Sequence, residues 1–335
     1  MLQAFQATLQ PMLMLFICIA IGFTLRKCNI LPDSAATVMA KLETWVFCPA
    51  LNFITMARFC TVQSLNTHIV NIIIAAISLV IALVIAIPLS RVFVPKKCYE
   101  QGVYQYALTF GNFGYVGDPL VLALFGDSVL SYFKLFSLPF TLAVYSWGMS
   151  VLVPSGNRES NPLKKIINPP TIAMLVGVAV GFSGLGGVNG IMDTALPFLS
   201  NTLDALKSCM GPVAMLLAGC TIARYDFLSM LQNRKVYIAT FLRLIVLPAF
   251  IIGCLFGIKE LANHLFSLQI TNNVLYLALF AIAAPLGLNT VVFPEAYGGN
   301  PKTGASMAMI SHTLCILTIP LMFALMTLVF GAPQW

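Results

Sequence analysis

Residues 107–126 have the sequence ALTFGNFGYVGDPLVLALFG, and residues 281–298 have the sequence AIAAPLGLNTVVFPEAYG. Each stretch is apolar enough to lie in a membrane, but each places glycine, asparagine and proline where a spanning helix needs an unbroken hydrogen-bond ladder. Backbone groups freed by such a break must line a cavity or find partners within the protein. A matched pair of broken helices, one in each half of a chain, indicates the binding site of a transporter.

The composition is that of an integral membrane protein. Of the 335 residues, 59% are hydrophobic and 9% are charged, whereas a soluble protein has about 25% charged residues. The nine cysteines form no C-x-x-C pair and lie mostly in apolar runs, so we predict neither disulfides nor a metal site. The formal net charge of +7 does not indicate a nucleic-acid partner, because the basic residues gather in one set of loops.

Apolar runs of about 20 residues, each long enough to cross a bilayer, divide the chain. We predict ten spans, at 10–27, 35–57, 67–90, 100–125, 128–153, 168–184, 197–222, 236–257, 273–297 and 304–331. Basic residues are concentrated in the loops on one side: Arg26, Lys27, Arg91, Lys96, Lys97, Arg158, Lys164, Lys165, Arg224, Arg234, Lys235 and Lys302. The opposite loops contain only Arg58 and Lys259. The positive-inside rule therefore predicts a multi-pass protein of the cell membrane with both termini external.

The two halves of the chain resemble each other weakly but in the same order. Pro11 and Gly22 of the first span match Pro170 and Gly181 of the sixth span with identical spacing, and the broken fourth and ninth spans also correspond. Each half has an odd number of spans, so the second half must enter from the opposite face. We therefore predict an all-α fold of two inverted five-helix repeats, at 1–153 and 168–335, joined by a cytoplasmic linker at 154–167.

The crossing of spans 4 and 9 is the predicted binding site. Two half-helix N-termini pointing into it would favour an anion, while unwound carbonyls would favour a cation. Side-chain amides can hold a carboxylate without a buried fixed charge. The predicted substrate-binding residues come from both breaks and from the second span: Asn52, Asn112, Phe113, Gly114, Pro285, Gly287, Asn289 and Thr290.

Acidic residues within the spans are candidates for ion coupling, because charge in the bilayer is costly and usually functional. Asp118 has two interpretations: it caps a helix that starts at Pro119, or it binds a proton or Na⁺. Glu295, near the cytoplasmic end of span 9, is the second candidate. No cofactor other than H⁺ or Na⁺ is expected.

Other charged residues also lie within predicted spans. Asp204 and Lys207 are three residues apart and can pair on one helix face. Lys134 is expected to extend to the membrane interface. Arg243 lies deeper, and we expect it to have an internal carboxylate partner.

The chain resembles the auxin efflux carrier family, which includes bacterial organic-anion permeases and plant auxin exporters. The resemblance rests on VFCPALNFI at 46–54, GNFGYVGDPL at 111–120, NPPTIA at 168–173, RLIVLP at 243–248 and APLGLN at 284–289. It implies ten helices with scaffold and transport parts interleaved across both repeats, an elevator-like motion, and spans 4 and 9 crossing at prolines, here Pro119 and Pro285. It also implies that Asn112 matches a residue that binds the carboxylate of auxin. The chain departs from the family pattern at Asp118 and Pro294.

These observations predict a secondary active transporter of a small organic anion, auxin-like or malate- or malonate-like, that works by alternating access. The expected partners are the substrate and the lipid bilayer, and a homodimer is one candidate assembly. The alternatives are a cation-coupled carrier of a neutral or cationic solute, a sensor that does not transport, and an intramembrane aspartyl protease using Asp118 and Asp226. We expect no enzyme activity, because the sequence contains no P-loop, H-E-x-x-H or G-x-S-x-G motif.

Overall fold

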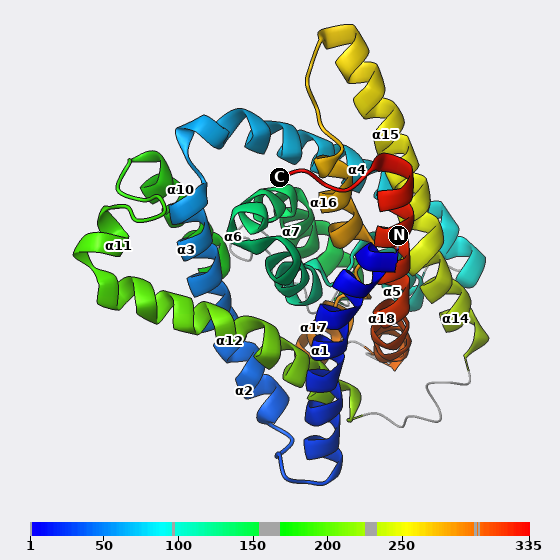
Figure 1. The fold of residues 1–335 in the computed structure, drawn as a ribbon. Helices are drawn as coiled ribbons and strands as arrows, with labels where there is room; N and C mark the ends of the chain where they lie inside the picture. The colour runs from blue at the N-terminus through cyan, green and yellow to red at the C-terminus, as the bar shows by residue number, and fades with distance from the viewer. Residues whose placement is uncertain (1, 96–97, 154–167, 225–232, 298–299, 301) are drawn as a thin grey trace.

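The computed structural model describes residues 2–95, 98–153, 168–224, 233–297, 300 and 302–335. Within these ranges the fold is all-helical, and the only β-type pairing is one isolated bridge. In Figure 1, α3, α10, α11 and α12 form one flank of the molecule and α14, α15 and α18 form the other, with α6 and α7 between them.

The helices of the first half are α1 (Leu2–Lys27), α2 (Ala35–Leu42), η1 (Glu43–Phe47), α3 (Cys48–Phe59), η2 (Val62–Ser64), α4 (Leu65–Phe93), α5 (Tyr99–Thr109), η3 (Phe113–Gly117), α6 (Asp118–Phe136), α7 (Leu138–Ala143), η4 (Val144–Gly148) and α8 (Met149–Leu152). Those of the second half are α10 (Pro169–Phe182), α11 (Ile191–Ala195), α12 (Pro197–Ile222), α14 (Arg234–Phe241), η6 (Leu242–Val246), α15 (Leu247–Phe266), α16 (Asn273–Ile282), α17 (Asn289–Tyr297) and α18 (Lys302–Phe330).

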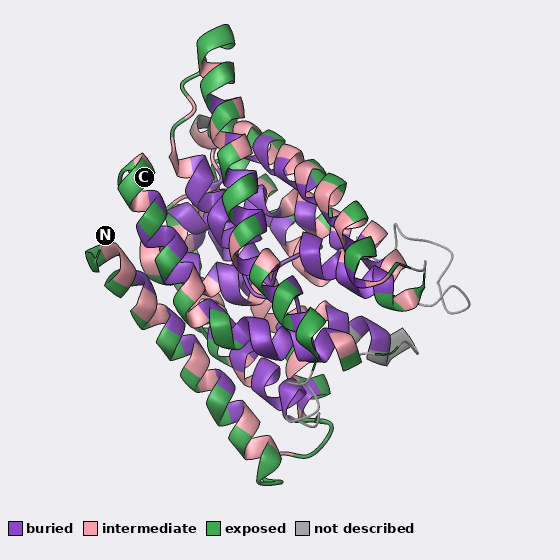
Figure 2. Ribbon diagram, turned by 90° about the vertical axis from the view of Figure 1, so that its right-hand side faces the viewer, coloured by how far each residue is buried: buried purple, intermediate pink, exposed green. Residues whose placement is uncertain are grey.

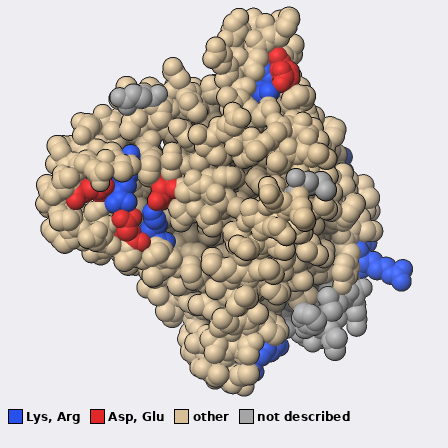
Figure 3. Space-filling view, viewed as in Figure 1, with Lys and Arg blue, Asp and Glu red and all other residues tan. Residues whose placement is uncertain are grey.

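The surface is that of a multi-pass membrane protein. Six helical stretches among the described residues are long and apolar enough to cross a bilayer: Leu2–Lys27, Leu65–Phe93, Phe113–Phe136, Pro197–Ile222, Arg234–Phe266 and Lys302–Phe330. Large apolar side chains such as Val84, Phe250 and Leu317 are exposed. Figure 2 shows exposed positions along the outer helices and buried positions gathered inside the molecule. Charged side chains gather in a few clusters and leave most of the face in Figure 3 uncharged. The count of ten spans and their inverted relation stay predictions, and the predicted linker 154–167 lies outside the described residues.

A sharp turn at Gly126 separates the outer part of the fourth predicted span from the fifth. Gly126 has φ 80° and ψ −174° inside α6, a conformation that glycine adopts at little cost. A straight helix would hold residues 118 and 134 about 24 Å apart, yet Lys134 and Asp118 form an ion pair. The turn therefore folds the chain back so that two buried charges meet.

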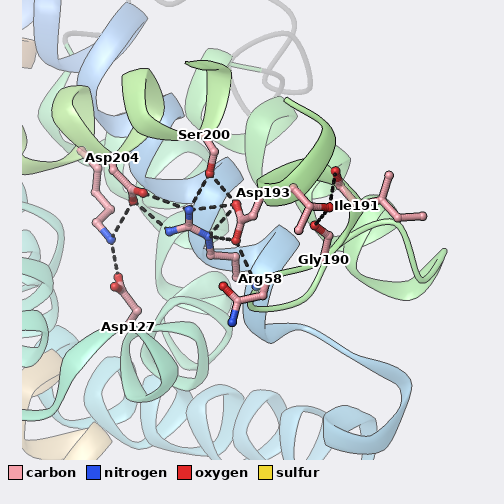
Figure 4. A network of polar contacts seen from close by, with 10 residues as sticks. Arg58, Asp127, Gly190, Ile191, Asp193, Ser200 and Asp204 are labelled. Atoms are coloured by element: carbon pink, nitrogen blue, oxygen red, sulfur yellow. Dashed lines mark hydrogen bonds and ion pairs between the residues drawn. The ribbon is translucent and has the colours of Figure 1, made fainter. Parts of the chain in front are cut away.

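A polar network ties α3 to α11 and α12 at the end of α3 (Figure 4). The guanidinium of Arg58 donates to Asp193 at 3.0 Å and to both carboxylate oxygens of Asp204 at 2.9 Å, and it also donates to Ser200. Burial alone would raise the pKa of Asp193, but hydrogen bonds from Arg58 and Ser200 outweigh burial and hold this pKa below its usual value. The network therefore fixes the ends of three helices relative to each other.

The same network continues across to α6. Lys207 Nζ lies 3.5 Å from Asp204, which confirms the predicted pair, and 2.6 Å from Asp127. Asp127 follows the turn at Gly126, so this ion pair joins α12 to the segment that leads away from the first broken helix (Figure 4).

Candidate functional site

Both broken segments are interrupted as predicted, and they cross at the interruptions. Gly111 and Leu286 form an antiparallel β-bridge. The N–H of Asn112 donates to the carbonyl of Pro285 at 2.6 Å, and the N–H of Leu286 donates to Ser311 Oγ at 3.0 Å. The crossing therefore satisfies some of the backbone groups that the breaks set free.

A helix begins directly after each break. The π-helical turn η3 starts at Phe113 and α17 starts at Asn289. The N–H groups of Val116 and Gly117 donate to the carbonyl of Asn112, whereas the N–H groups of the first helical residues have no acceptor within the helix. Two helix N-termini, each with a partial positive charge, therefore start at the crossing.

A cavity of about 140 Å³ lies beside the crossing. Its wall includes residues of both breaks together with parts of α3, α6, α7, η4, α10 and α12. Seven of the residues predicted for substrate or ion binding line it: Asn52, Asn112, Phe113, Gly114, Asp118, Gly287 and Asn289. Their roles in binding stay predictions, but the fold brings them to the wall of one cavity.

The two asparagines of the breaks are each held by one hydrogen bond. His312 Nδ1 lies 2.7 Å from the carbonyl oxygen of Ala308 and therefore carries the ring hydrogen, which it donates to that oxygen. His312 Nε2 is then an acceptor, and Asn112 Nδ2 donates to it at 3.1 Å. Asn289 Nδ2 donates to the hydroxyl of Tyr106 at 3.2 Å. An amide nitrogen carries two hydrogens, so each asparagine is oriented by one hydrogen and keeps the second for another acceptor.

Asp118 is not a helix cap. Its dihedral angles are helical (φ −57°, ψ −54°), because η3 already precedes it and runs into α6 without interruption. Its Oδ2 accepts a hydrogen bond from Lys134 Nζ, and its Oδ1 has no partner among the described residues. The expectation that Lys134 extends to the interface is wrong, since this side chain is 7% exposed and lines the cavity.

The remaining predicted site residues have different places. Asn52 donates from Nδ2 to the carbonyl of Pro170 at 2.9 Å, so it joins α3 to α10 at the cavity wall. Thr290 is fully buried and donates to the carbonyl of Gly287 at 2.9 Å, which closes the first turn of α17. Thr290 is absent from the cavity wall, as its hydroxyl is used within the helix.

The two prolines implied by the family resemblance are not equivalent. Pro285 lies at the crossing and contributes its carbonyl. Pro119 lies in the first turn of α6 and faces α12, where a methyl group added at Gly211 would lie 3.1 Å from its side chain. The side chain of Glu295 lies outside the described residues.

The sequence analysis named Lys134 and Arg243 but did not predict their partners. Lys134 was separated from Asp118 by sixteen positions, and only the turn at Gly126 makes them neighbours. Arg243 has no carboxylate partner among the described residues, contrary to expectation. The helices α5 and α18 pack against η6, which carries Arg243. The only acidic residue in these two helices is Glu100, in the first turn of α5, so neither helix places an acid at the level of Arg243 in the membrane.

A polytopic helical protein whose two interrupted helices cross beside a cavity with polar side chains in its wall has the architecture of a membrane transporter. The chain belongs to the auxin efflux carrier family: the family described as "Membrane transport protein" matches residues 7–323. An uncharacterized transporter of Methanocaldococcus jannaschii is 22% identical over 313 residues, which is 92% of this chain and 96% of that protein. Protein PIN-LIKES 2 of Arabidopsis thaliana is 33% identical over 104 residues, 31% of this chain and 23% of that protein.

Proposed function

We propose that the protein is a secondary transporter of a small organic anion, a mono- or dicarboxylate, which binds in the cavity at the helix crossing. The observation that carries the proposal is the composition of this cavity. It combines a buried lysine and two oriented side-chain amides with the N-termini of two half-helices. Each of these groups donates hydrogen bonds, and together they suit a carboxylate.

The pair of Asp118 and Lys134 suggests how transport is coupled. In the empty cavity the two charges balance each other, so an incoming carboxylate would add an unbalanced negative charge at low dielectric. A proton on Asp118 removes that excess and leaves Lys134 for the substrate. We therefore propose H⁺ as the coupling ion, moved in the same direction as the anion.

A carrier of a neutral solute is the second candidate, because Asp118 and Lys134 already balance within the wall. The protease hypothesis has no support, since Asp118 pairs with a lysine and Asp226 lies outside the described residues. Organic acids and their uncharged amides differ mainly in the carboxylate, so comparing them separates an anion carrier from a neutral-solute carrier.

The experiment is a thermal-shift screen of the purified protein with matched acid and amide pairs, such as malonate with malonamide and indole-3-acetate with indole-3-acetamide. A ligand that binds the folded state raises the unfolding midpoint by mass action. We expect an acid to stabilise the protein and its amide to have little effect. Equal shifts for both members of every pair would favour the neutral-solute carrier.

Substitution of Asn112 tests whether the ligand binds in the cavity. We expect Asn112→Ala to reduce the affinity for the stabilising acid by about tenfold or more, because one buried hydrogen bond to a charged group is lost. Asn66→Ala, on the exposed face of α4, is the matched control and should bind normally. Equal binding by both variants would place the ligand elsewhere.

A further inference from the structure

Arg243 is a buried cation without a partner. It lies in the π-helical turn η6 and is 1% exposed. None of its three guanidinium nitrogens has a hydrogen-bond partner among the described residues. A buried charge is normally paired or hydrogen-bonded. The positive charge of Arg243 must therefore be stabilised by groups other than a carboxylate.

The guanidinium lies at the helix crossing. A methyl group added at Gly111 would collide with Arg243 Nη2 and would lie 3.0 Å from the carbonyl oxygens of Ala281 and Ala284. Gly111 is itself the residue that bridges to the second break. Arg243 therefore sits behind the crossing, beside carbonyl groups of the second broken helix.

These carbonyls carry negative potential. The half-helices α5 and α16 end at Thr109 and Ile282, so two C-termini, each with a partial negative charge, meet at the crossing. In a continuous helix the carbonyl of Ala281 would accept a hydrogen bond from the N–H of residue 285. Residue 285 is a proline and has no N–H, so this carbonyl loses its helical donor. Half-helix C-termini and unwound carbonyls of this kind are the groups that hold Na⁺ in cation-coupled transporters with broken helices.

We propose that Arg243 is a built-in cation that replaces a coupling Na⁺ at the paired C-termini of α5 and α16. Its fixed charge balances the two helix dipoles in every state of the transport cycle. The crossing can therefore form without a bound ion. The inference goes beyond the proposed function, since it concerns the cation requirement of the crossing and not the substrate.

The test measures the unfolding midpoint of purified protein without substrate, in NaCl and in choline chloride at equal ionic strength. Wild type should give the same midpoint in both salts. Arg243→Gln should be less stable in choline and should gain roughly 5 °C in saturating Na⁺, because the freed carbonyls then bind the ion. Arg243→Lys keeps the charge and should respond to neither salt.

Arg234→Gln is the matched control, because Arg234 is exposed at the start of α14 in the same continuous helical stretch, Arg234–Phe266. It should behave as wild type. The proposal fails if wild type is itself stabilised by Na⁺ relative to choline, or if Arg243→Gln gains no Na⁺ response. Should Arg243→Gln not fold, Arg243→Lys decides: a folded, salt-indifferent protein supports the proposal and an unfolded one overturns it. Failure of the substrate screen leaves this result unaffected, because no substrate is used.

Discussion

At the scale of single residues, the site is defined by charges that the fold hides. Lys134 and Asp118 are almost completely buried, at 7% and 1% exposed, and each has the other as its ionic partner. Removing one member of a buried pair leaves the other charge uncompensated, whereas removing both need not destabilise. This asymmetry makes the pair accessible to a double-mutant cycle.

Lys134→Met is expected to lower the free energy of unfolding by about 3 kcal/mol, because it leaves the carboxylate of Asp118 buried and unpaired. The double variant Asp118→Asn with Lys134→Met should recover most of that loss.

Asp118→Asn alone should abolish the pH dependence of anion uptake in proteoliposomes. Unchanged pH dependence in Asp118→Asn would exclude this residue as the proton carrier.

At the scale of helices, glycines allow the closest contacts. A methyl group at Gly22 of α1 would collide with the backbone of Leu216 on α12, and one at Gly181 of α10 would collide with the backbone of Cys60 at the end of α3. Small residues allow membrane helices to approach in this way. Gly22 and Gly181 are the positions matched between the two halves in the sequence, and each packs on the second span of the other half. This exchange of contacts is what two related halves would give, and their inverted relation stays a prediction.

Gly22→Ala and Gly181→Ala should therefore destabilise the protein by similar amounts, about 1–3 kcal/mol each, since both force backbones apart. Gly253→Ala is the control, because a methyl group there meets nothing within 4 Å. It should be neutral or stabilising by up to about 1 kcal/mol, as alanine favours a helix over glycine. Thermal unfolding in detergent measures all three, and unequal losses at the matched glycines would argue against equivalent contacts.

At the scale of the whole molecule, the cavity lies between two groups of helices. One group contains α3, α10, α11 and α12, and in it Arg58 ties α3 to α11 and α12. The other contains the two broken helices. The ion pair of Lys207 with Asp127, at 2.6 Å, links the groups on the predicted external side. If the groups move relative to each other during transport, this link must open.

Lys207→Met or Asp127→Asn should therefore speed opening of the cavity while changing stability by no more than about 1 kcal/mol, because the pair is partly exposed. Cys48 lines the cavity and can report this opening. In a variant that keeps Cys48 as its only cysteine, labelling by a membrane-impermeant maleimide should be faster when the pair is broken. The charge-swapped double variant should restore the slow rate, and equal rates throughout would show that the pair does not restrain the motion.

Local sequence was enough to predict the membrane class, the family, the positions of both breaks and seven residues of the cavity wall. These properties follow from local composition and spacing. A single proline is accommodated within a helix, as at Pro11, Pro88, Pro212 and Pro320, whereas glycine, asparagine and proline clustered together end it. The partners of the buried charges depend on the tertiary structure. Asp118 lies inside a helix because η3 precedes it, Lys134 reaches Asp118 through the turn at Gly126, and Arg243 has no carboxylate partner among the described residues. Such pairings depend on the direction and rotation of whole helices, which are set by contacts between residues far apart in the chain.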